Sequence, residues 1–177
     1  MAFDLILSNV AKHIDLAEQE KVFFTNLLVE TKVNKKTYIV QNGTLCRNIN
    51  FVNTGLLRAF YLNNEGKEAT VMFAISDWWI TDMYCFSNVL PAMVNIEAVK
   101  ESHILSLSKS NFDLLVKEVP KFERFFRIMF QKAYVREQLR MIQRLSAPAE
   151  ERYYSFLEKY PQIARHITQK QIAYYLG

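Results

Sequence analysis

The sequence is poor in cysteine: Cys46 and Cys85 are the only two among 177 residues. Two thiols do not make a disulfide framework, and an iron–sulfur cluster usually needs four thiolates. The sequence therefore predicts neither a disulfide-stabilised domain nor an iron–sulfur protein. For Cys85, a buried and unreactive thiol is the plainer interpretation, and a reactive thiol is the alternative.

Long apolar runs are missing as well. No stretch approaches the roughly 20 apolar residues that a membrane-spanning helix needs. The first residues, MAFDLILSNV, lack the basic region and the cleavage pattern of a signal peptide. Hydrophobic residues nonetheless make up 50% of the chain, which is enough for a folded core. We therefore expect a soluble cytoplasmic protein without a membrane partner.

Motifs for metal binding and catalysis are also lacking. The histidines His13, His103 and His166 do not sit at metal-ligand spacing, and no H-x-H pair occurs. No glycine-rich phosphate loop, nucleophile elbow or paired-carboxylate motif is present. The sequence therefore predicts no metal site, no cofactor, no catalytic residues and no enzymatic activity.

The most informative stretch that is present, Pro120–Leu145, predicts a helix about 37 Å long at 1.5 Å per residue. It contains no glycine, and its only proline comes first, where a helix tolerates it. An apolar stripe with helical spacing is typical of a helix that pairs with a second helix. The stripe, our predicted dimer interface, consists of Phe125, Ile128, Val135, Leu139 and Ile142. A second apolar face predicts packing on the helix's own domain: Phe122, Phe126, Met129 and Tyr134.

The segments before this helix predict an antiparallel sandwich or barrel of short strands. The expected strands are Thr37–Val40, Leu45–Val52, Leu56–Leu62, Ala69–Ile75, Asn95–Lys100 and His103–Leu107. Turn signals separate them, and the one at Asn63–Gly66 predicts a hairpin. Two short helices flank the strands: one is capped by Asp15 and carries residues up to Leu28, and the other covers Ser110–Lys117.

Two more helices are predicted after the long one. The first covers Ala149–Lys159 and is stopped by Pro161. The second begins at a capping box formed by Thr168 and Gln171 and ends at Gly177. A helix followed by a leucine–glycine turn is how a helix-turn-helix motif begins.

Charge is distributed unevenly along the chain. Residues 1–120 hold 11 Lys and Arg against 13 Asp and Glu, whereas residues 121–177 hold 11 against 5. The resulting charges of −2 and +6 predict an anionic partner for the C-terminal part. The alternative, which the sequence leaves open, is that the arginines merely solvate the long helix. These are Arg124, Arg127, Arg136, Arg140 and Arg144.

The order of these segments resembles the Crp/Fnr family of bacterial transcription regulators, in the divergent form common among Bacteroidetes. Phe51-Val-Asn-Thr-Gly55-Leu-Leu-Arg58 is similar to the family's F-V-x-x-G-x-x-R strand pair, and Gly43 is placed like the glycine of the preceding turn. Pro120–Leu145 resembles the family's dimerisation helix. Ile167–Gly177 resembles the first helix and turn of its winged helix-turn-helix.

The resemblance implies an α+β fold in three parts. Residues 1–112 would form an N-terminal antiparallel β-roll, jelly-roll-like and of cyclic-nucleotide-binding type. Residues 113–146 would form a connecting and dimerisation helix, and residues 147–177 the truncated start of a winged helix-turn-helix domain. It further implies a homodimer that binds double-stranded DNA in the full-length protein, with RNA polymerase as another expected partner. Thr168, Gln169 and Lys170 would contact DNA phosphates rather than bases.

The phosphate cassette departs from the family pattern, which has Gly-Glu followed by an arginine ten residues after the glutamate. Thr81 and Asp82 stand at the Gly-Glu position, and Ala92 stands at the arginine. Asp82 retains the ability to accept a hydrogen bond from a ribose hydroxyl. Ala92 cannot form the charge-assisted contact that a cyclic nucleotide depends on. We therefore expect an effector other than cyclic AMP, or none.

The aromatic-rich segment Asp77–Tyr84 would line the effector cavity of the β-roll, and it suits an apolar or planar ligand. The plainer interpretation, which we favour, is that Trp78 and Trp79 simply fill the core. The residues predicted for an effector pocket are Trp78, Trp79, Thr81, Asp82, Tyr84, Met93 and Asn95.

The sequence thus predicts a DNA-binding transcription regulator of the Crp/Fnr type whose β-roll senses a small molecule. The alternative is a small-molecule-binding or protein-interaction β-roll module without a role on DNA. Residues encoded after Gly177 would discriminate between these two hypotheses, since a DNA-reading recognition helix is expected for the transcription regulator and not for the β-roll module. No pattern in the sequence identifies the effector, the operator, or activation as opposed to repression.

Overall fold

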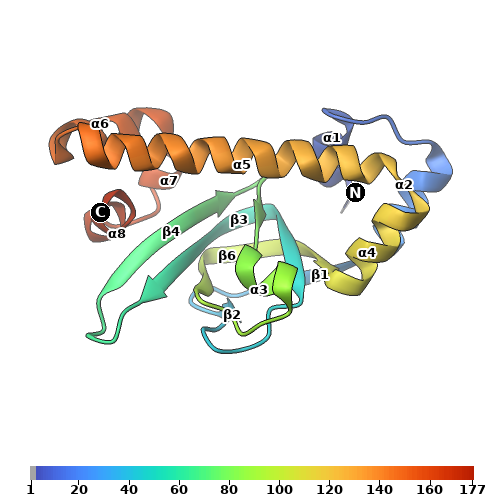
Figure 1. The fold of residues 1–177 in the computed structure, drawn as a ribbon, viewed down its shortest axis with the longest axis horizontal. Helices are drawn as coiled ribbons and strands as arrows, with labels where there is room; N and C mark the ends of the chain where they lie inside the picture. Colours follow the sequence, from blue (N-terminus) through green and yellow to red (C-terminus); the bar gives the residue numbers. More distant parts are fainter. Residues whose placement is uncertain (1–2) are drawn as a thin grey trace.

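Two long antiparallel strands, β3 (Asn48–Leu62) and β6 (Asn95–Ser108), form the centre of the computed structural model, which describes residues 3–177 (Figure 1). The path of the sheet is β1-β6-β3-β4, with β2 paired to β6 and β5 paired to β3. Every pairing is antiparallel, as expected for strands of this kind. The shorter strands are β1 (Leu28–Val33), β2 (Tyr38–Val40), β4 (Glu68–Ile75) and β5 (Trp79–Ile80).

Helices flank this β-roll at both ends, and one helix crosses its whole length (Figure 1). The crossing helix is α5 (Lys121–Ser146), within one residue of its predicted bounds at each end. Helices α1, α2 and α4 lie near its N-terminal end, and α6–α8, which we call the C-terminal head, gather at the other end. Their bounds are α1 Asp4–Ala11, α2 Glu18–Asn26, α3 Met83–Asn88, α4 Lys109–Glu118, α6 Ala149–Lys159, α7 Pro161–Ala164 and α8 Gln169–Leu176.

The predicted hairpin at Asn63–Gly66 is confirmed and joins β3 to β4. Asn63 Oδ1 accepts hydrogen bonds from the backbone N–H groups of Glu65 and Lys67, at 3.0 and 2.8 Å. Gly66 has a φ of 77°, which an L-residue adopts only with strain. An asparagine at the first position and a glycine near the end thus close the turn, as the sequence pattern indicates.

Two predicted strands, Leu45–Val52 and Leu56–Leu62, are in fact one continuous strand, β3, bent in its middle. The bend lies at Gly55, where φ is 113° and the pairing with β6 shifts register. A Cβ atom at Gly55 would lie 2.6 Å from Ser102 Cα of β6. The backbones of β3 and β6 therefore approach so closely at this point that only glycine fits. The turn signal in the sequence marks this bend rather than a loop.

The prediction for the N-terminal region was wrong in several respects. Helix α2 begins after Ala17, whose N–H donates to Glu20 Oε2 at 2.7 Å, and Asp15 does not cap it. Leu28, assigned to this helix from sequence, is the first residue of β1. No glycine or proline marks that change from helix to strand. Helices α1, α3 and α7 were not predicted, because four to eight residues without a capping box give too weak a pattern to recognise.

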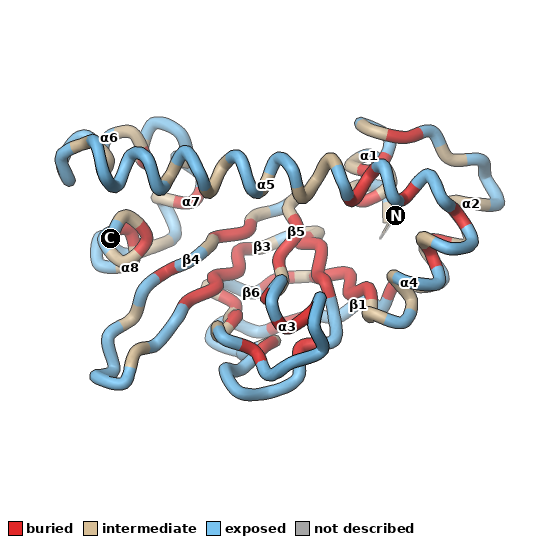
Figure 2. Tube along the Cα trace, viewed as in Figure 1, coloured by how far each residue is buried: buried red, intermediate tan, exposed pale blue. Residues whose placement is uncertain are grey.

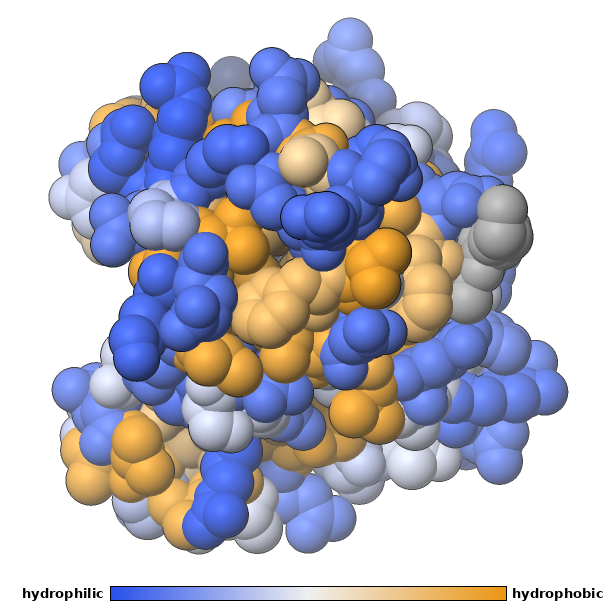
Figure 3. All heavy atoms as spheres, turned by 90° about the vertical axis from the view of Figure 1, so that its right-hand side faces the viewer, coloured by the Kyte–Doolittle hydropathy of each residue, from blue (hydrophilic) through white to orange (hydrophobic). Residues whose placement is uncertain are grey.

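Within residues 3–177 the buried hydrophobic side chains form three clusters, and Figure 2 marks the buried residues along the chain trace. The interior of the β-roll is filled by aliphatic residues such as Val52, Leu57 and Ile96. An aromatic-rich group joins the roll to α1, α2, α4 and α5. Partly buried apolar residues lie at the edge of this group, and Figure 3 shows an exposed apolar area on the face that lies on the right of Figure 1. The third group, with Phe73 and Tyr175 at its centre, holds the C-terminal head against β4.

Gly55 provides a direct test of the crossing between β3 and β6. We expect Gly55→Ala to lower the free energy of unfolding by about 3 kcal/mol, because it combines backbone strain with overpacking. Gly66→Ala is the matched control: its φ is also positive, but a Cβ there meets nothing within 4 Å. Its cost should be about 1 kcal/mol. Urea unfolding measures both, and equal losses would contradict the steric argument.

Candidate functional site

Asp82 lies at the start of α3 and is almost completely buried, with 5% of its surface exposed. Its Oδ1 accepts a hydrogen bond from the N–H of Cys85 at 3.1 Å. Its Oδ2 accepts from the N–H groups of Met93 and Val94 at 2.7 and 3.1 Å. The carboxylate therefore binds three backbone donors of its own chain, and those donors are not available to a bound phosphate.

Ala92 lies inside the β-roll with 3% of its surface exposed. Its N–H donates to Thr44 O and its carbonyl accepts from Gly43 N–H, both at 2.8 Å. The buried methyl group packs with the aliphatic residues that fill the roll. The position where the resemblance would place a phosphate-binding arginine is thus part of an apolar core, where an unpaired phosphate would be costly.

The two cysteines are both buried, and they contact each other beside Asp82. Cys85 Sγ accepts from the N–H of Cys46 at 2.8 Å and donates to the carbonyl of Cys46 at 3.3 Å. Burial raises the pKa of the Cys85 thiol, and the hydrogen bond from the Cys46 N–H offsets only part of that rise. A buried thiol with a raised pKa is a poor nucleophile.

A cavity of about 320 Å³ lies where β5 and the loop before it meet α1 and α5. Its walls are largely apolar, with Trp78, Trp79, Met129 and Phe130 among them. Its polar residues are Asn9, Lys12, His13, Asp77, Thr81, Lys132 and Arg136. An apolar cavity with a few polar groups is the usual form of a small-molecule site.

Of the seven residues predicted for an effector pocket, Trp78, Trp79 and Thr81 line this cavity. The other four do not line it: Asp82, Tyr84, Met93 and Asn95. Tyr84 and Met93 are about half exposed, and Asn95 Oδ1 accepts from the N–H of Asn42 at 3.0 Å. Trp79 is at the same time a core residue, 8% exposed and packed edge-on against Phe51.

Helix α1 supplies a polar network at one side of the cavity. Lys12 forms an ion pair with Asp77, and Asn9 Nδ2 donates to Asp77 Oδ1 at 2.9 Å. Asn9 Oδ1 in turn accepts from the indole N–H of Trp79 at 3.1 Å. Sequence reasoning missed these residues, because α1 was not predicted and its partners lie about 70 residues away in the chain.

His13 and Lys132 face each other at the rim of the cavity, with Lys132 Nζ 3.2 Å from His13 Nε2. The pKa of His13 is lowered, first by partial desolvation and then by the positive charge of Lys132. Lys12 and Arg124 add weaker repulsion of the same sign. His13 is therefore neutral at pH 7 and accepts the hydrogen bond that Lys132 donates.

Trp78 forms the boundary between the cavity and the C-terminal head. The guanidinium of Arg136 lies 5.1 Å from the Trp78 ring centroid. The ring of Tyr160, at the junction of α6 and α7, lies edge-on at 6.0 Å between centroids. Trp78 therefore contacts both the cavity and the head, as do Met72 and Arg136 beside it.

The predicted DNA-contacting residues Thr168, Gln169 and Lys170 are all exposed at the start of α8. The predicted capping box is confirmed: the N–H of Gln171 donates to Thr168 Oγ1 at 3.2 Å, and the Gln171 side chain accepts from Thr168 N–H at 2.9 Å. Ile172 and Tyr175, on the other face of α8, are buried against β4.

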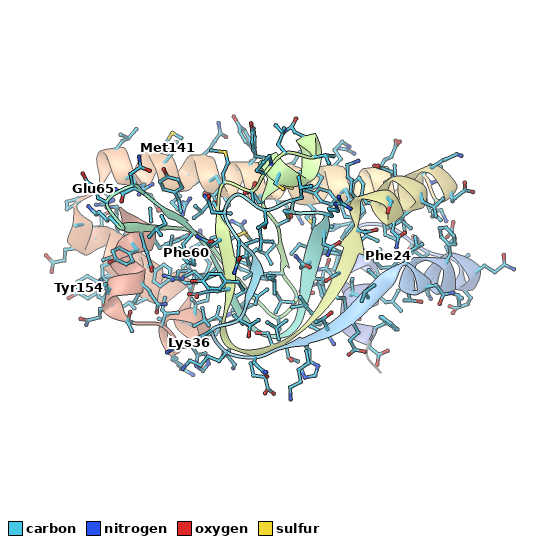
Figure 4. The ribbon with its side chains drawn as sticks, turned by 90° about the horizontal axis from the view of Figure 1, so that it is seen from below. Phe24, Lys36, Phe60, Glu65, Met141 and Tyr154 are labelled. Atoms are coloured by element: carbon cyan, nitrogen blue, oxygen red, sulfur yellow. The ribbon has the colours of Figure 1, made fainter. Side chains whose placement is uncertain are left out.

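The five residues predicted for a dimer interface do not share one environment. Phe125 is 1% exposed inside its own chain, and Ile128 is half-buried. Val135, Leu139 and Ile142 are each at least 50% exposed. The unpartnered apolar part of α5 is thus its C-terminal half, where Met141 also points outward (Figure 4).

Within residues 3–177, no helix is long and apolar enough to cross a membrane. The same residues contain no group of three or more His, Cys, Asp and Glu side chains able to hold a metal ion.

Residues 30–118 match the cyclic nucleotide-binding domain family, and the chain belongs to that family. The fold extends over most of the length of several solved structures. A protein from Eubacterium rectale assigned to the Crp/Fnr family of transcriptional regulators is 22% identical, with a TM-score of 0.73 over 92% of this chain and 78% of its own. FixK2 from Bradyrhizobium japonicum is 16% identical, with a TM-score of 0.74 over 85% of this chain and 77% of its own.

A third similar structure is CLP from Xanthomonas campestris, described as a c-di-GMP-responsive global regulator. It is 11% identical, with a TM-score of 0.68 over 86% of this chain and 76% of its own. No curated protein sequence matches the chain. The fold class implied by the resemblance, an antiparallel β-roll with a long helix as in Crp/Fnr regulators, is confirmed.

The thiol geometry leads to a labelling prediction. In the folded protein at pH 8, Cys46 and Cys85 should react with Ellman's reagent at least about tenfold more slowly than in guanidinium, because both are buried and the pKa of Cys85 is raised. Ser87→Cys, two residues along the same helix at an exposed position, is the matched control and should react promptly. Rapid reaction of native Cys85 would contradict this assignment.

Proposed function

We propose that the chain is a DNA-binding transcription regulator of the Crp/Fnr type whose effector is not a cyclic nucleotide. The observation that carries the proposal is a cyclic nucleotide-binding-type β-roll followed by a long basic helix and a helical head. The division follows the three parts given above: residues 1–112 form the effector domain, residues 113–146 connect, pair and line one side of the effector cavity, and residues 147–177 begin the DNA-binding domain. Catalysis has no part in this proposal, and the solved structures of similar fold are regulators.

The cassette supports an effector other than cyclic AMP. The buried methyl of Ala92 replaces the cation that a phosphate would need, and Asp82 already holds the backbone donors beside it. Aliphatic side chains fill the interior of the β-roll. The cavity at α5 is the better candidate, since it already has the form of a small-molecule site.

The long helix gives this cavity a route to the head. Trp78 lines the cavity and contacts Tyr160 of the head, while Arg136 of α5 stacks on the same ring. An effector would act by binding one arrangement of Trp78 and the head more tightly than another. The head would then change its position relative to β4, and with it the geometry in which two heads meet DNA.

Dimerisation is assigned to the C-terminal half of α5. Leu139→Glu combined with Ile142→Glu should convert a dimer to a monomer in light scattering, because both changes place charges on an unpartnered apolar face. Val22→Glu is the matched control, with the same change at a 57% exposed position on α2. If the double variant remained a dimer, the C-terminal half of α5 would not form the dimer interface.

DNA binding should depend on salt and on the start of α8. In fluorescence anisotropy with a mixed-sequence duplex at low salt, we expect binding that weakens steeply as salt rises. Lys170→Gln should reduce the slope of log K against log salt by about one per protomer, because one phosphate contact is lost. Lys35→Gln, at an exposed position of the acidic part, should leave the slope unchanged. Absence of binding even at low salt would favour a β-roll module without a role on DNA.

A further inference from the structure

The cavity at α5 has a size and lining that define a class of ligand. Its volume of about 320 Å³ lies at the lower end of the range for small-molecule sites. Trp78, Phe130 and Met129 supply aromatic and thioether surface along its walls. Such surfaces favour a flat ring, because aromatic faces and polarizable sulfur pack well against a π system.

The rim of the cavity carries an excess of positive charge. Lys12, Lys132 and Arg136 line it, whereas Asp77 is the acidic residue in the lining. Asp77 is already paired with Lys12. Arg136 stacks on Trp78 and lies 3.7 Å from Glu137. Among the residues that the structure describes, Lys132 makes no ion pair with a carboxylate, and its contact is with the neutral ring of His13.

We propose that this cavity binds a small aromatic carboxylate, with the carboxylate at Lys132 and the ring against Trp78 and Phe130. The inference rests on the proposed function and names the class of effector. Charge pairing with Lys132 holds one end of the ligand, and burial of the ring supplies the remaining affinity. A ring that packs against Trp78 also reaches the residue that contacts the head.

The polar groups of the cavity disfavour a nucleotide as the ligand. Both ends of the Asn9 amide are engaged, with Asp77 and with Trp79. The Thr81 hydroxyl donates to the carbonyl of Asn48 at 2.8 Å. The hydroxyl groups of a ribose would therefore have few free hydrogen-bond partners in this cavity. A ring with a single anionic group needs only the charge of Lys132 and the apolar walls.

Binding should be coupled to protonation of His13. The charged groups around this ring are the adjacent Lys12, Arg124 and Lys132 on α5, and Asp77 across the cavity. An anion placed at Lys132 favours the protonated ring, so the pKa of His13 rises when the ligand binds. By linkage the affinity increases as pH falls through that pKa, as long as the ligand remains ionised, above about pH 5.

The test uses benzoate as the probe, with benzamide as its uncharged counterpart. Calorimetry on the whole chain should give a Kd near or below the millimolar range for so small a molecule. Lys132→Met should weaken benzoate binding at least tenfold and leave benzamide unchanged. Lys35→Met is the matched control and should bind benzoate like the original protein. Ala133→Leu, which adds volume to the cavity wall without changing charge, should weaken both probes.

An NMR titration of the His13 ring provides a second readout, with His103 and His166 as references outside the cavity. Saturating benzoate should raise the pKa of His13, and in Lys132→Met this rise should vanish. Equal benzoate affinity with and without Lys132, or no binding to any variant, would overturn the proposal. These measurements involve no DNA, so loss of the ligand class and failure of the DNA-binding proposal are separate outcomes.

Discussion

The contact on which the other parts of the molecule depend is the aromatic packing beneath the N-terminal half of α5. Phe122 lies 4.7 Å from Phe24 of α2, and Phe126 lies 5.9 Å from Trp79 of β5, between ring centroids. Each such buried side chain contributes about 1.5–3 kcal/mol relative to exposure. These contacts fix the helix on the β-roll over its first two to three turns. The α5 residues that line the cavity run from Phe125 to Arg136, so the cavity lies directly beside this aromatic packing.

The motif that carries the family resemblance is architectural in this chain. Gly55 allows β3 and β6 to cross closely. Arg58 is 4% exposed, and its guanidinium bonds Glu68 of β4 and Glu97 of β6 at 2.7 Å each. The same guanidinium stacks over the ring of Phe60 at 4.2 Å. A buried arginine held by two carboxylates is costly to leave unpaired, so this network fixes the order of three strands. The Arg58 network therefore stabilises the fold, and other residues recognise the ligand.

The sequence predicted those features that depend on local chemistry. Three such features are the long helix, the hairpin after Asn63 and the cap at Thr168. Each depends on apolar periodicity, turn residues or capping residues that lie within a few positions of one another in the chain. The cavity could not be predicted in the same way. It depends on α1 reaching residues about 70 positions away, through Asn9 and Trp79. Phe125 shows the same limit. Its spacing fits the apolar stripe predicted as a dimer interface, but its ring is buried inside its own chain. Which face of a helix is buried depends on the elements packed against it.

The placement of the cavity also shows how the proposed effector could act on the head without a phosphate site in the β-roll. A ligand inside the β-roll would act on the head only through the sheet and α5. The cavity at α5 is bounded by Trp78, which already contacts Tyr160 of the head. As proposed, an effector there needs no cassette arginine, so nothing maintains a cation at Ala92. In the proposed arrangement the aliphatic interior of the roll supports the fold, and the charged rim at Lys132 recognises the ligand.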